Sequence, residues 1–414
     1  MDTIKEASQL MEMNLANEAI ILIQEALDKA TDHEKKTYAA FFMEWGFLDE
    51  ARSILEPLND MSHDSHVILM LAEIYTEQQE DAMAIELLLL IDSEDDAYLP
   101  ALVQLADLYE QEGLFEVAEQ KLLEAKRIAP QEEVIDFALG ELYYSVGEYN
   151  RAILYYEKMT TDMLDVSISE RLAHCFTAIG KYEVAFNYFK SIKEPNFFTL
   201  FSYGLTAFQL ERDDVTIHVL EKLLKQDPYY HSAYPLLAEA YERQGLINEA
   251  YNTVKQGLEY DEFNKELYYY LGILSQKLNR IAESEAMFQE AIALDPDYKE
   301  AILSLIALWK DVGRTESIIG LIEDVKKTGS VDALYEWELG RAYLEIDERK
   351  QALNAYKQAY TNLQDDPDFL KEYGTLLNEE GMQQEALNTF RAYLNIISDD
   401  YDVAAFVERI EERD

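Results

Sequence analysis

Two short stretches of the sequence hold residue types that could do chemistry. In "SHDSH" (62–66), His63 and His66 stand three residues apart around Asp64, a set that could hold a divalent metal ion. The stretch falls in an expected turn between helices, however, where polar residues are common for other reasons. We therefore predict no metal site there.

The single cysteine is the other candidate. Cys175 directly follows His174, which pairs a thiol with a base in sequence. Neighbouring residues on a helix point about 100° apart, so the pairing favours a packed structural cysteine over a nucleophile. Acidic runs lack the glycine and alternating ligands of a calcium loop, and neither a phosphate loop nor a serine–histidine–acid set is apparent. We expect no catalytic residue and no cofactor.

Most of the chain repeats with a period of about 34 residues, which points to helical hairpins. With one repeat starting at Leu99, twelve units fit in register, and eleven of their twelve eighth residues are alanine or glycine. These eighth residues are Ala7, Ala39, Ala72, Ala106, Gly140, Ala173, Gly204, Ala238, Gly272, Ile306, Gly340 and Gly374. The twentieth residue is alanine in nine units. Because two helices approach to about 8–10 Å only where small residues meet, these positions predict the crossing of two antiparallel helices.

The ends of these helices are also marked. The fifteenth residue is glycine in seven units, where it can adopt a positive φ and end the first helix. These glycines are Gly46, Gly113, Gly147, Gly180, Gly245, Gly313 and Gly381. Pro130, Pro228 and Pro296 close their units by stopping a helix or opening the next.

With this spacing of small, aromatic and proline residues, the chain resembles a bacterial-type, cytoplasmic member of the tetratricopeptide-repeat (TPR) family. "LGELYYSVGEYNRAILYYEK" and "LLAEAYERQGLINEAYNTVKQGLEYD" match well, and the resemblance runs from about Ile4 to about Asp399. It implies an all-α fold, a right-handed α-solenoid of about twelve hairpins. In this family the first helices line a concave groove that holds a partner's peptide or helix.

The expected organisation is two arrays, residues 1–196 with repeats 1–6 and residues 197–400 with repeats 7–12, followed by a capping helix over 401–414. We expect one continuous solenoid, with a hinge predicted near 193–197 because Pro195 separates two units there. Ile306 and Ile318 stand at both crossing positions of one unit and should widen that hairpin.

The resemblance implies a groove face from positions two, five, six, nine and twelve of the first helices. Arginine and histidine near that face could bind an acidic group of a partner, or they could form ion pairs within the chain. The aromatic residues could anchor a partner, or they could pack as ordinary core. The peptide-groove candidates are Phe137, Glu141, Tyr144, Arg171, His174, Phe198, Phe201, Phe208, Glu239, Tyr269, Tyr270 and Arg341.

The family's carboxylate clamp, which holds a partner's C-terminal carboxylate, is not matched. Lys36 and Met70 stand where lysine and asparagine would be wanted, and the central units offer Phe137, Glu141 and Glu239 instead.

Composition restricts the partners. With 35 basic and 82 acidic residues, the formal charge of −47 disfavours nucleic acid and anionic membranes. The N-terminus shows no signal peptide, and "IELLLLI" is too short to span a bilayer. A single cysteine fits a reducing compartment, so we predict a cytoplasmic protein.

We therefore predict a non-enzymatic scaffold or adaptor that binds a basic or amphipathic segment of a partner protein in its groove. A regulatory or assembly subunit of an enzyme complex, for example in cell-envelope or secretion machinery, is the main alternative. A self-assembling structural protein is less favoured.

Overall fold

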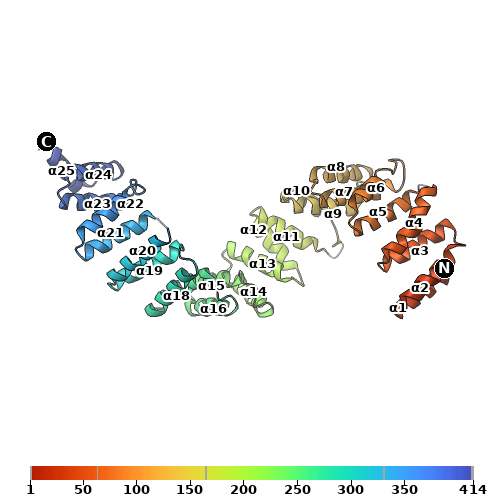
Figure 1. Ribbon diagram of the computed structural model, residues 1–414, viewed down its shortest axis with the longest axis horizontal. Helices are drawn as coiled ribbons and strands as arrows, with labels where there is room; N and C mark the ends of the chain where they lie inside the picture. Colours follow the sequence, from red (N-terminus) through yellow and green to blue (C-terminus); the bar gives the residue numbers. More distant parts are fainter. Residues whose placement is uncertain (1, 63, 164–165, 330–331, 412–414) are drawn as a thin grey trace. The chain divides into compact units, whose positions relative to one another are not determined.

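The computed structural model describes residues 2–62, 64–163, 166–329 and 332–411 and is helical throughout those ranges (Figure 1). Within them the one extended pairing is an isolated bridge between Met163 and Val166. The chain divides into two compact units, Met1–Thr206 and Ala207–Asp414. Each unit is a row of helical hairpins, as the repeat pattern predicts.

Unit 1 contains six complete hairpins and most of a further first helix (red to yellow in Figure 1). Its helices are α1 (Asp2–Glu12) and α2 (Ala16–Leu27), α3 (Asp32–Glu44) and α4 (Leu48–Ser62), α5 (Ser65–Glu77) and α6 (Asp81–Leu88), α7 (Tyr98–Gln111) and α8 (Phe115–Ile128), α9 (Glu133–Ser145) and α10 (Tyr149–Tyr156), α11 (Ile168–Ala178) and α12 (Tyr182–Ser191), and then α13 (Phe197–Gln209).

Unit 2 continues the same pattern to the C-terminal end (green to blue in Figure 1). Its helices are α14 (Asp213–Gln226), α15 (Ala233–Arg243) and α16 (Ile247–Tyr260), α17 (Lys265–Lys277) and α18 (Ile281–Leu294), α19 (Lys299–Asp311) and α20 (Thr315–Lys327), α21 (Ala333–Glu345) and α22 (Arg349–Tyr360), α23 (Pro367–Glu379) and α24 (Gln383–Ile396), and finally α25 (Tyr401–Glu411). The described residues thus give twelve helix pairs and one additional helix, as expected.

The boundary between the units lies within α13, beyond the expected boundary at 196/197. The reason is local packing of α13 on unit 1. The Tyr203 ring lies 5.3 Å from that of Phe186 and 5.8 Å from that of Phe189. The hydroxyls of Thr177 and Thr206 are 3.2 Å apart. Most of α13 therefore belongs to the first unit.

Hairpins stack in the same way inside each unit. A second helix packs on its own first helix and on the first helix of the next hairpin, as α8 does on α7 and α9. Successive first helices α3, α5, α7 and α9 also contact each other. They form one side of unit 1, which we call the first-helix face.

All twelve residues at position fifteen adopt a left-handed backbone conformation. The seven glycines have φ between 68° and 78°. The other five residues, with φ between 55° and 62°, are Asn14, Gln79, Glu211, Asn279 and Asp347. In each unit the next residue donates its N–H to a carbonyl five residues earlier, for example Leu114 to Tyr109 at 2.8 Å. The predicted end of the first helix at glycine is confirmed, and in five repeats the helix ends in the same way at a residue other than glycine.

Every residue at positions eight and twenty is buried, which confirms the predicted crossing. The structure adds that four of the five glycines at position eight face an aromatic ring at position twenty-four. A Cβ placed on these glycines would lie 2.5 to 2.7 Å from ring carbon atoms. The pairs are Gly140 with Tyr156, Gly272 with Phe288, Gly340 with Tyr356 and Gly374 with Phe390.

Two further features predicted in the C-terminal half are also visible. Ile306 and Ile318 are buried, and their helices α19 and α20 pack less closely than the helices of the neighbouring hairpins. At the C-terminal end, α25 buries Val403 and Val407 against α24, and the rings of Phe390 and Phe406 lie 5.2 Å apart. Helix α25 therefore caps the last hairpin.

Candidate functional site

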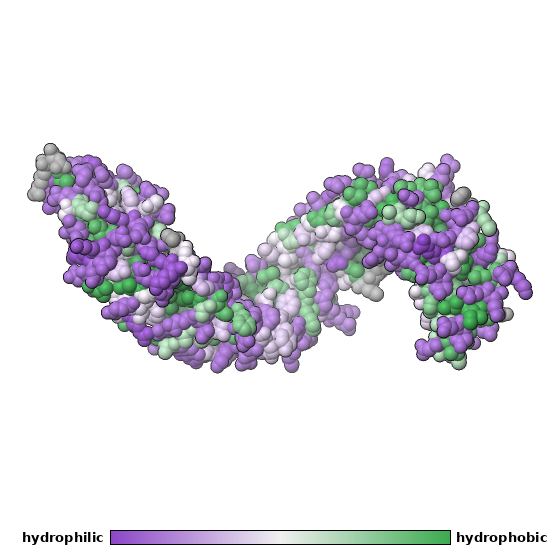
Figure 2. All heavy atoms as spheres, in the orientation of Figure 1, coloured by the Kyte–Doolittle hydropathy of each residue, from purple (hydrophilic) through white to green (hydrophobic). Residues whose placement is uncertain are grey.

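A groove of about 420 Å³ lies between α7 and α9 on the first-helix face of unit 1, and we call it the α7–α9 groove. Its floor and walls are mostly aliphatic or small, with carboxylates on α7 and α9. The lining residues are Val103, Gln104, Ala106, Asp107, Glu110, Leu122, Val134, Phe137, Ala138 and Glu141. All but Ala106 and Leu122 come from the predicted positions of the first helices. In the view of Figure 2 hydrophilic residues cover most of each unit, and hydrophobic residues reach the surface in small areas.

Two carboxylates on α7 give the groove its charge. Asp107 and Glu110 lie one helical turn apart, and among the described residues neither has a basic partner. Their hydrogen bonds come from neutral groups, because Gln111 Nε2 donates to Asp107 at 2.8 Å and Ser145 Oγ donates to Glu110 at 2.7 Å. Within the described residues, no cation therefore compensates the charge of either carboxylate.

The acidity extends to the neighbouring first helix. Glu73 on α5 occupies the same repeat position as Asp107 on α7 and Glu141 on α9. Desolvation, and then the nearby charge of Glu77, raise the pKa of Glu73. A column of three carboxylates therefore crosses α5, α7 and α9 at position nine.

Glu141, in contrast, already forms an ion pair within the chain. Arg171 on α11 holds it through two bonds, Nε to Oε1 and Nη2 to Oε2, each 2.8 Å long. The Tyr156 hydroxyl also donates to this carboxylate, and the Arg171 guanidinium lies 4.6 Å from the ring centre of Tyr144. Burial, followed by this hydrogen bond, raises the pKa of Tyr156. Glu141 is a fixed wall of the groove.

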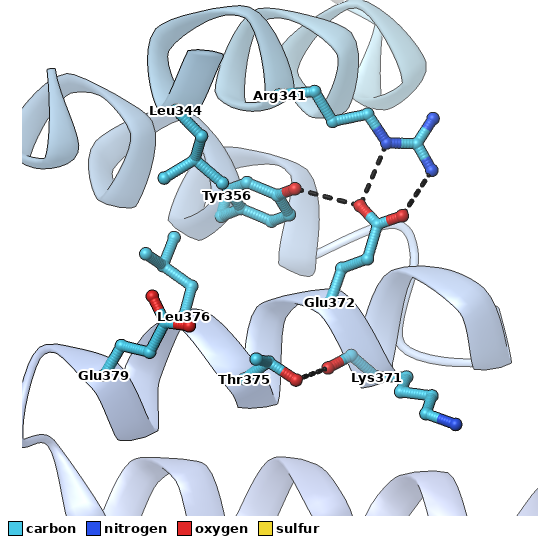
Figure 3. A pocket seen from close by; sticks show the side chains of 8 residues that line it. All are labelled: Arg341, Leu344, Tyr356, Lys371, Glu372, Thr375, Leu376 and Glu379. Carbon is cyan, nitrogen blue, oxygen red and sulfur yellow. Dashed lines mark hydrogen bonds and ion pairs between the residues drawn. The ribbon is translucent and has the colours of Figure 1, made fainter. Parts of the chain in front are cut away.

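A second groove, of about 470 Å³, lies on α21 and α23 in unit 2, and Figure 3 shows its side chains. We call it the α21–α23 groove, and its lining residues are Arg341, Leu344, Tyr356, Lys371, Glu372, Thr375, Leu376 and Glu379. Arg341 binds Glu372 through Nε at 2.9 Å and Nη2 at 2.7 Å, and the Tyr356 hydroxyl donates to the same carboxylate at 2.9 Å (Figure 3).

The remaining charges of the α21–α23 groove are also compensated. Lys371 donates to Asp400 at 2.6 Å, and Glu379 accepts from Arg349 at 3.0 Å. Among the described residues this groove therefore offers no unpaired charge, unlike the α7–α9 groove.

Glu141 of the α7–α9 groove and Arg341 of the α21–α23 groove form the same ion pair with the next repeat, with the charges exchanged. Glu141 and Arg341 both occupy position nine of their repeats, and Arg171 and Glu372 both occupy position six of the next repeat. A tyrosine at position twenty-four, Tyr156 or Tyr356, donates to the carboxylate in either arrangement. We call each pair an inter-repeat latch. Both arginines form ion pairs within the chain, as the alternative interpretation of the sequence expected.

The other candidates of unit 1 surround His174. Its Nδ1 lies 3.3 Å from the Tyr144 hydroxyl, and its ring lies 4.8 Å from that of Phe198 in an edge-to-face arrangement. His174 is buried, its Nε2 has no hydrogen-bond partner, and desolvation lowers its pKa. Phe198 is exposed and Phe201 is partly buried on the same helix, α13. This cluster lies outside the α7–α9 groove.

The remaining candidates of unit 2 are spread over α13, α15 and α17. Phe208 is buried beneath the Arg243 guanidinium at 3.6 Å, and exposed Glu239 accepts from Arg243 at 3.1 Å. Tyr269 packs on Phe288, with ring centres 5.9 Å apart. Tyr270 donates to Glu242 at 3.2 Å.

The candidates therefore do not form one site. The α7–α9 groove contains Phe137 and Glu141, and the α21–α23 groove contains Arg341. Sequence reasoning did not place Val103, Glu110 and Val134 among the candidates, although they stand at positions five, twelve and two of the predicted face. Their position in the repeat was the only feature of the sequence that could have identified these aliphatic and acidic residues as part of the groove.

Neither stretch singled out for chemistry forms a reactive centre in the described part of the chain. Asp64 accepts from Lys36 at 2.7 Å and from the His66 N–H at 3.0 Å, while His63 lies outside the described residues. Over the ranges described, no group of three or more metal-binding side chains is arranged to hold an ion. Cys175 is fully buried, and desolvation raises the pKa of its thiol to about 12, which confirms a packed cysteine.

The helices described also give no candidate for a membrane span, because none combines the length and the hydrophobicity that crossing a bilayer requires.

The repeated hairpins and the groove on their first helices define a TPR protein, and family comparisons agree. Residues 334–400 match the YpiA-like C-terminal tetratricopeptide repeats, residues 110–164 the YpiA-like tetratricopeptide repeats and residues 265–298 a tetratricopeptide repeat. The TPR repeat-containing protein YpiA of Bacillus subtilis (strain 168) is 35% identical over 415 residues, which cover 99% of this chain and 98% of that protein. The chain belongs to the YpiA-like TPR family.

More distant similarities extend over parts of the chain. The transcription factor tau 131 kDa subunit of Saccharomyces cerevisiae is 22% identical over 169 residues, 41% of this chain and 16% of that protein. YrrB, described as a TPR protein with an unusual peptide-binding site, is 17% identical with a TM-score of 0.39, over 44% of this chain and 96% of YrrB. The C-terminal part of a TPR repeat-containing protein from Cytophaga hutchinsonii is 14% identical with a TM-score of 0.43, over 64% and 97%. We draw no functional conclusion from similarities at this level.

Proposed function

We propose that this protein is a non-enzymatic, cytoplasmic interaction scaffold whose α7–α9 groove binds an amphipathic segment with basic side chains from a partner protein. Membership of a TPR family supports a role in protein interaction, since such repeats are generally interaction scaffolds. The observation that carries the choice of partner is the pair of uncompensated carboxylates, Asp107 and Glu110, beside an aliphatic floor.

The floor accounts for the apolar side of the partner. Val134 is 43% exposed, although it is a large aliphatic residue at the start of α9. Ala106 and Ala138 are small, so an incoming aliphatic side chain has room between α7 and α9. Burying such a side chain contributes about 25 cal/mol for each Å² of apolar surface removed from water.

The carboxylates account for the basic side. Residues three apart on a helix have side chains about 5–6 Å from each other, so Asp107 and Glu110 can meet two basic side chains one turn apart on a helical partner. Glu73 adds a further negative charge on α5, and no ion pair within the described residues competes for these three carboxylates. Opposite charges in a partner would raise the association rate and fix its register.

The test uses the full chain and a fluorescein-labelled 18-residue peptide of leucine, alanine and lysine with an amphipathic helical pattern. A second peptide has glutamate in place of lysine. We expect the lysine peptide to bind, and the double variant Asp107→Asn, Glu110→Gln to weaken it roughly five- to tenfold at low salt. At 0.5 M salt the difference should shrink, because the charges are screened.

A matched control removes two charges from another exposed surface. Glu18 and Glu25 lie on the exposed side of α2, and Glu18→Gln, Glu25→Gln changes the net charge by the same amount. An equal loss of affinity in both double variants would mean that only the overall acidity attracts the peptide. Either that result or unchanged binding after the α7 substitutions would overturn the proposal.

A further inference from the structure

Exposed aromatic rings gather at two successive turns of unit 2. Tyr229, in the turn between α14 and α15, is 67% exposed, and Tyr260 at the end of α16 is 36% exposed. Phe263, in the turn between α16 and α17, is 74% exposed. Tyr229 and Phe263 hold the same position in consecutive repeats. We call these three residues the aromatic edge.

Two of these rings are held in place by the fold. The rings of Tyr229 and Tyr260 meet edge to face at 5.3 Å, and Tyr260 stacks on buried Tyr234 at 6.3 Å. The Tyr234 hydroxyl donates to the Pro228 carbonyl at 2.8 Å, and the Tyr229 N–H donates to Asp227 at 3.0 Å. The edge-to-face contact leaves the broad faces of one ring uncovered by the other.

Acidic residues adjoin the aromatic edge in the sequence. Asp227 precedes Tyr229 by two residues, Glu259 precedes Tyr260, and Glu262 precedes Phe263. Burial raises the pKa of Tyr234 to about 12, with contributions from Tyr260 and from the charges of Asp227 and Glu259. Those charges therefore act on the same group of rings.

Elsewhere the chain combines rings and carboxylates with its own arginines. In three places a guanidinium lies 3.6 to 3.9 Å from a ring centre and also binds a carboxylate. These sets are Arg151 with Tyr143 and Glu119, Arg243 with Phe208 and Glu239, and Arg341 with Trp337 and Glu372. At the aromatic edge, no lysine or arginine within the described residues lies over a ring.

We propose that the aromatic edge is a second interaction surface, which binds arginine side chains of a partner protein. The planar guanidinium stacks on the exposed tyrosine or phenylalanine ring, and its N–H groups bond to the neighbouring carboxylates. The partner supplies the cation that Arg151, Arg243 and Arg341 supply inside the chain. This surface lies in unit 2, on turns between hairpins, and is independent of the α7–α9 groove.

The test measures binding of two fluorescein-labelled peptides, four Gly-Arg repeats and four Gly-Lys repeats, to the full chain by fluorescence anisotropy. Their charge is equal, so general attraction to an acidic protein affects both. We expect Tyr229→Ala, Phe263→Ala to weaken the arginine peptide roughly three- to fivefold and the lysine peptide less, because guanidinium stacks on rings better than ammonium does. The substitutions leave every charge in place.

Tyr401→Ala is the matched control, because Tyr401 is an exposed tyrosine, 82% accessible, far along the chain on α25. It should bind the arginine peptide as the parent protein does. Unchanged arginine binding in the aromatic-edge variant would overturn this inference, as would an equal loss for both peptides. The variant Asp107→Asn, Glu110→Gln separates the two proposals, since it should leave the preference for arginine over lysine intact.

Discussion

The Cα of Gly272 faces the ring of Phe288, so closely that a Cβ at this position would lie 2.6 Å from Cε1 of the ring. The first helix α17 and the second helix α18 meet at this contact. In the repeat that starts at Leu99, Ala106 and Leu122 hold the equivalent positions. Glycine at position eight thus stands opposite an aromatic ring in four repeats, whereas alanine at that position stands opposite leucine in this one.

We expect Gly272→Ala to destabilise its hairpin by about 1–3 kcal/mol, because the added methyl overpacks a ring that is fully buried. Adding Phe288→Leu should recover part of that loss, since it recreates the alanine–leucine pair of Ala106 and Leu122. Hydrogen exchange of the α17 and α18 amides would measure both effects. No recovery in the double variant would mean that the ring at position twenty-four is not the reason why glycine is required at position eight.

A second expectation concerns the left-handed residues at position fifteen. Gln79 has a φ of 62°, a conformation that a side chain disfavours by roughly 1 kcal/mol relative to glycine. Gln79→Gly should therefore stabilise the hairpin of α5 and α6 by up to about 1 kcal/mol, measured by denaturant unfolding. The converse change, Gly113→Gln at a φ of 77°, should destabilise the next hairpin. Equal effects of the same sign would contradict the role of φ.

The inter-repeat latches can be tested by exchanging their charges. Glu141→Arg alone places two arginines together and should cost about 1–3 kcal/mol, given that both side chains are partly exposed. Adding Arg171→Glu should restore most of the stability, because the pair then has the order found in Arg341 and Glu372. A double-mutant cycle on the thermal midpoint would show the coupling. Additive losses would exclude a shared latch geometry.

Acidification should weaken the cluster around His174. Desolvation lowers its pKa in the folded chain, so the unfolded chain binds the proton more readily. Neutral His174 therefore contributes to the free energy of unfolding above the pKa of histidine in the unfolded chain, about 6.5. This contribution is lost as the pH falls below that value. His174→Gln should remove this part of the pH dependence between pH 7 and pH 5, whereas His218→Gln, at an exposed position, should not. Thermal unfolding at the two pH values measures the difference, and identical profiles for both variants would contradict it.

The hinge predicted near 193–197 has a direct test in limited proteolysis. Helix α12 ends at Ser191, α13 begins at Phe197, and Lys193 and Glu194 between them are exposed. We expect trypsin to cut first after Lys193. Earlier cleavage within the hairpins of Leu99 to Met159 would argue against a weak junction there.

The sequence was sufficient to predict the hairpins, because small residues at positions eight and twenty and glycine at position fifteen each have one physical role. It was less informative about the groove. Whether Glu141 faces a partner or an arginine depends on Arg171, which lies 30 residues away and is brought near only by stacking of the hairpins. Phe137 and Phe208 were equally compatible with groove and core, and packing buries both of them.

The opposite polarity of the two inter-repeat latches restricts how the repeats can be recombined. If recombination between tandem repeats joined the hairpin of Glu141 directly to the hairpin of Glu372, two carboxylates would occupy one latch and repel each other. Joining the hairpin of Arg341 to that of Arg171 would bring two guanidinium groups together. The order of the acidic and basic residues in the latches therefore disfavours shortened or shuffled arrays, in which like charges meet, relative to the native order of hairpins.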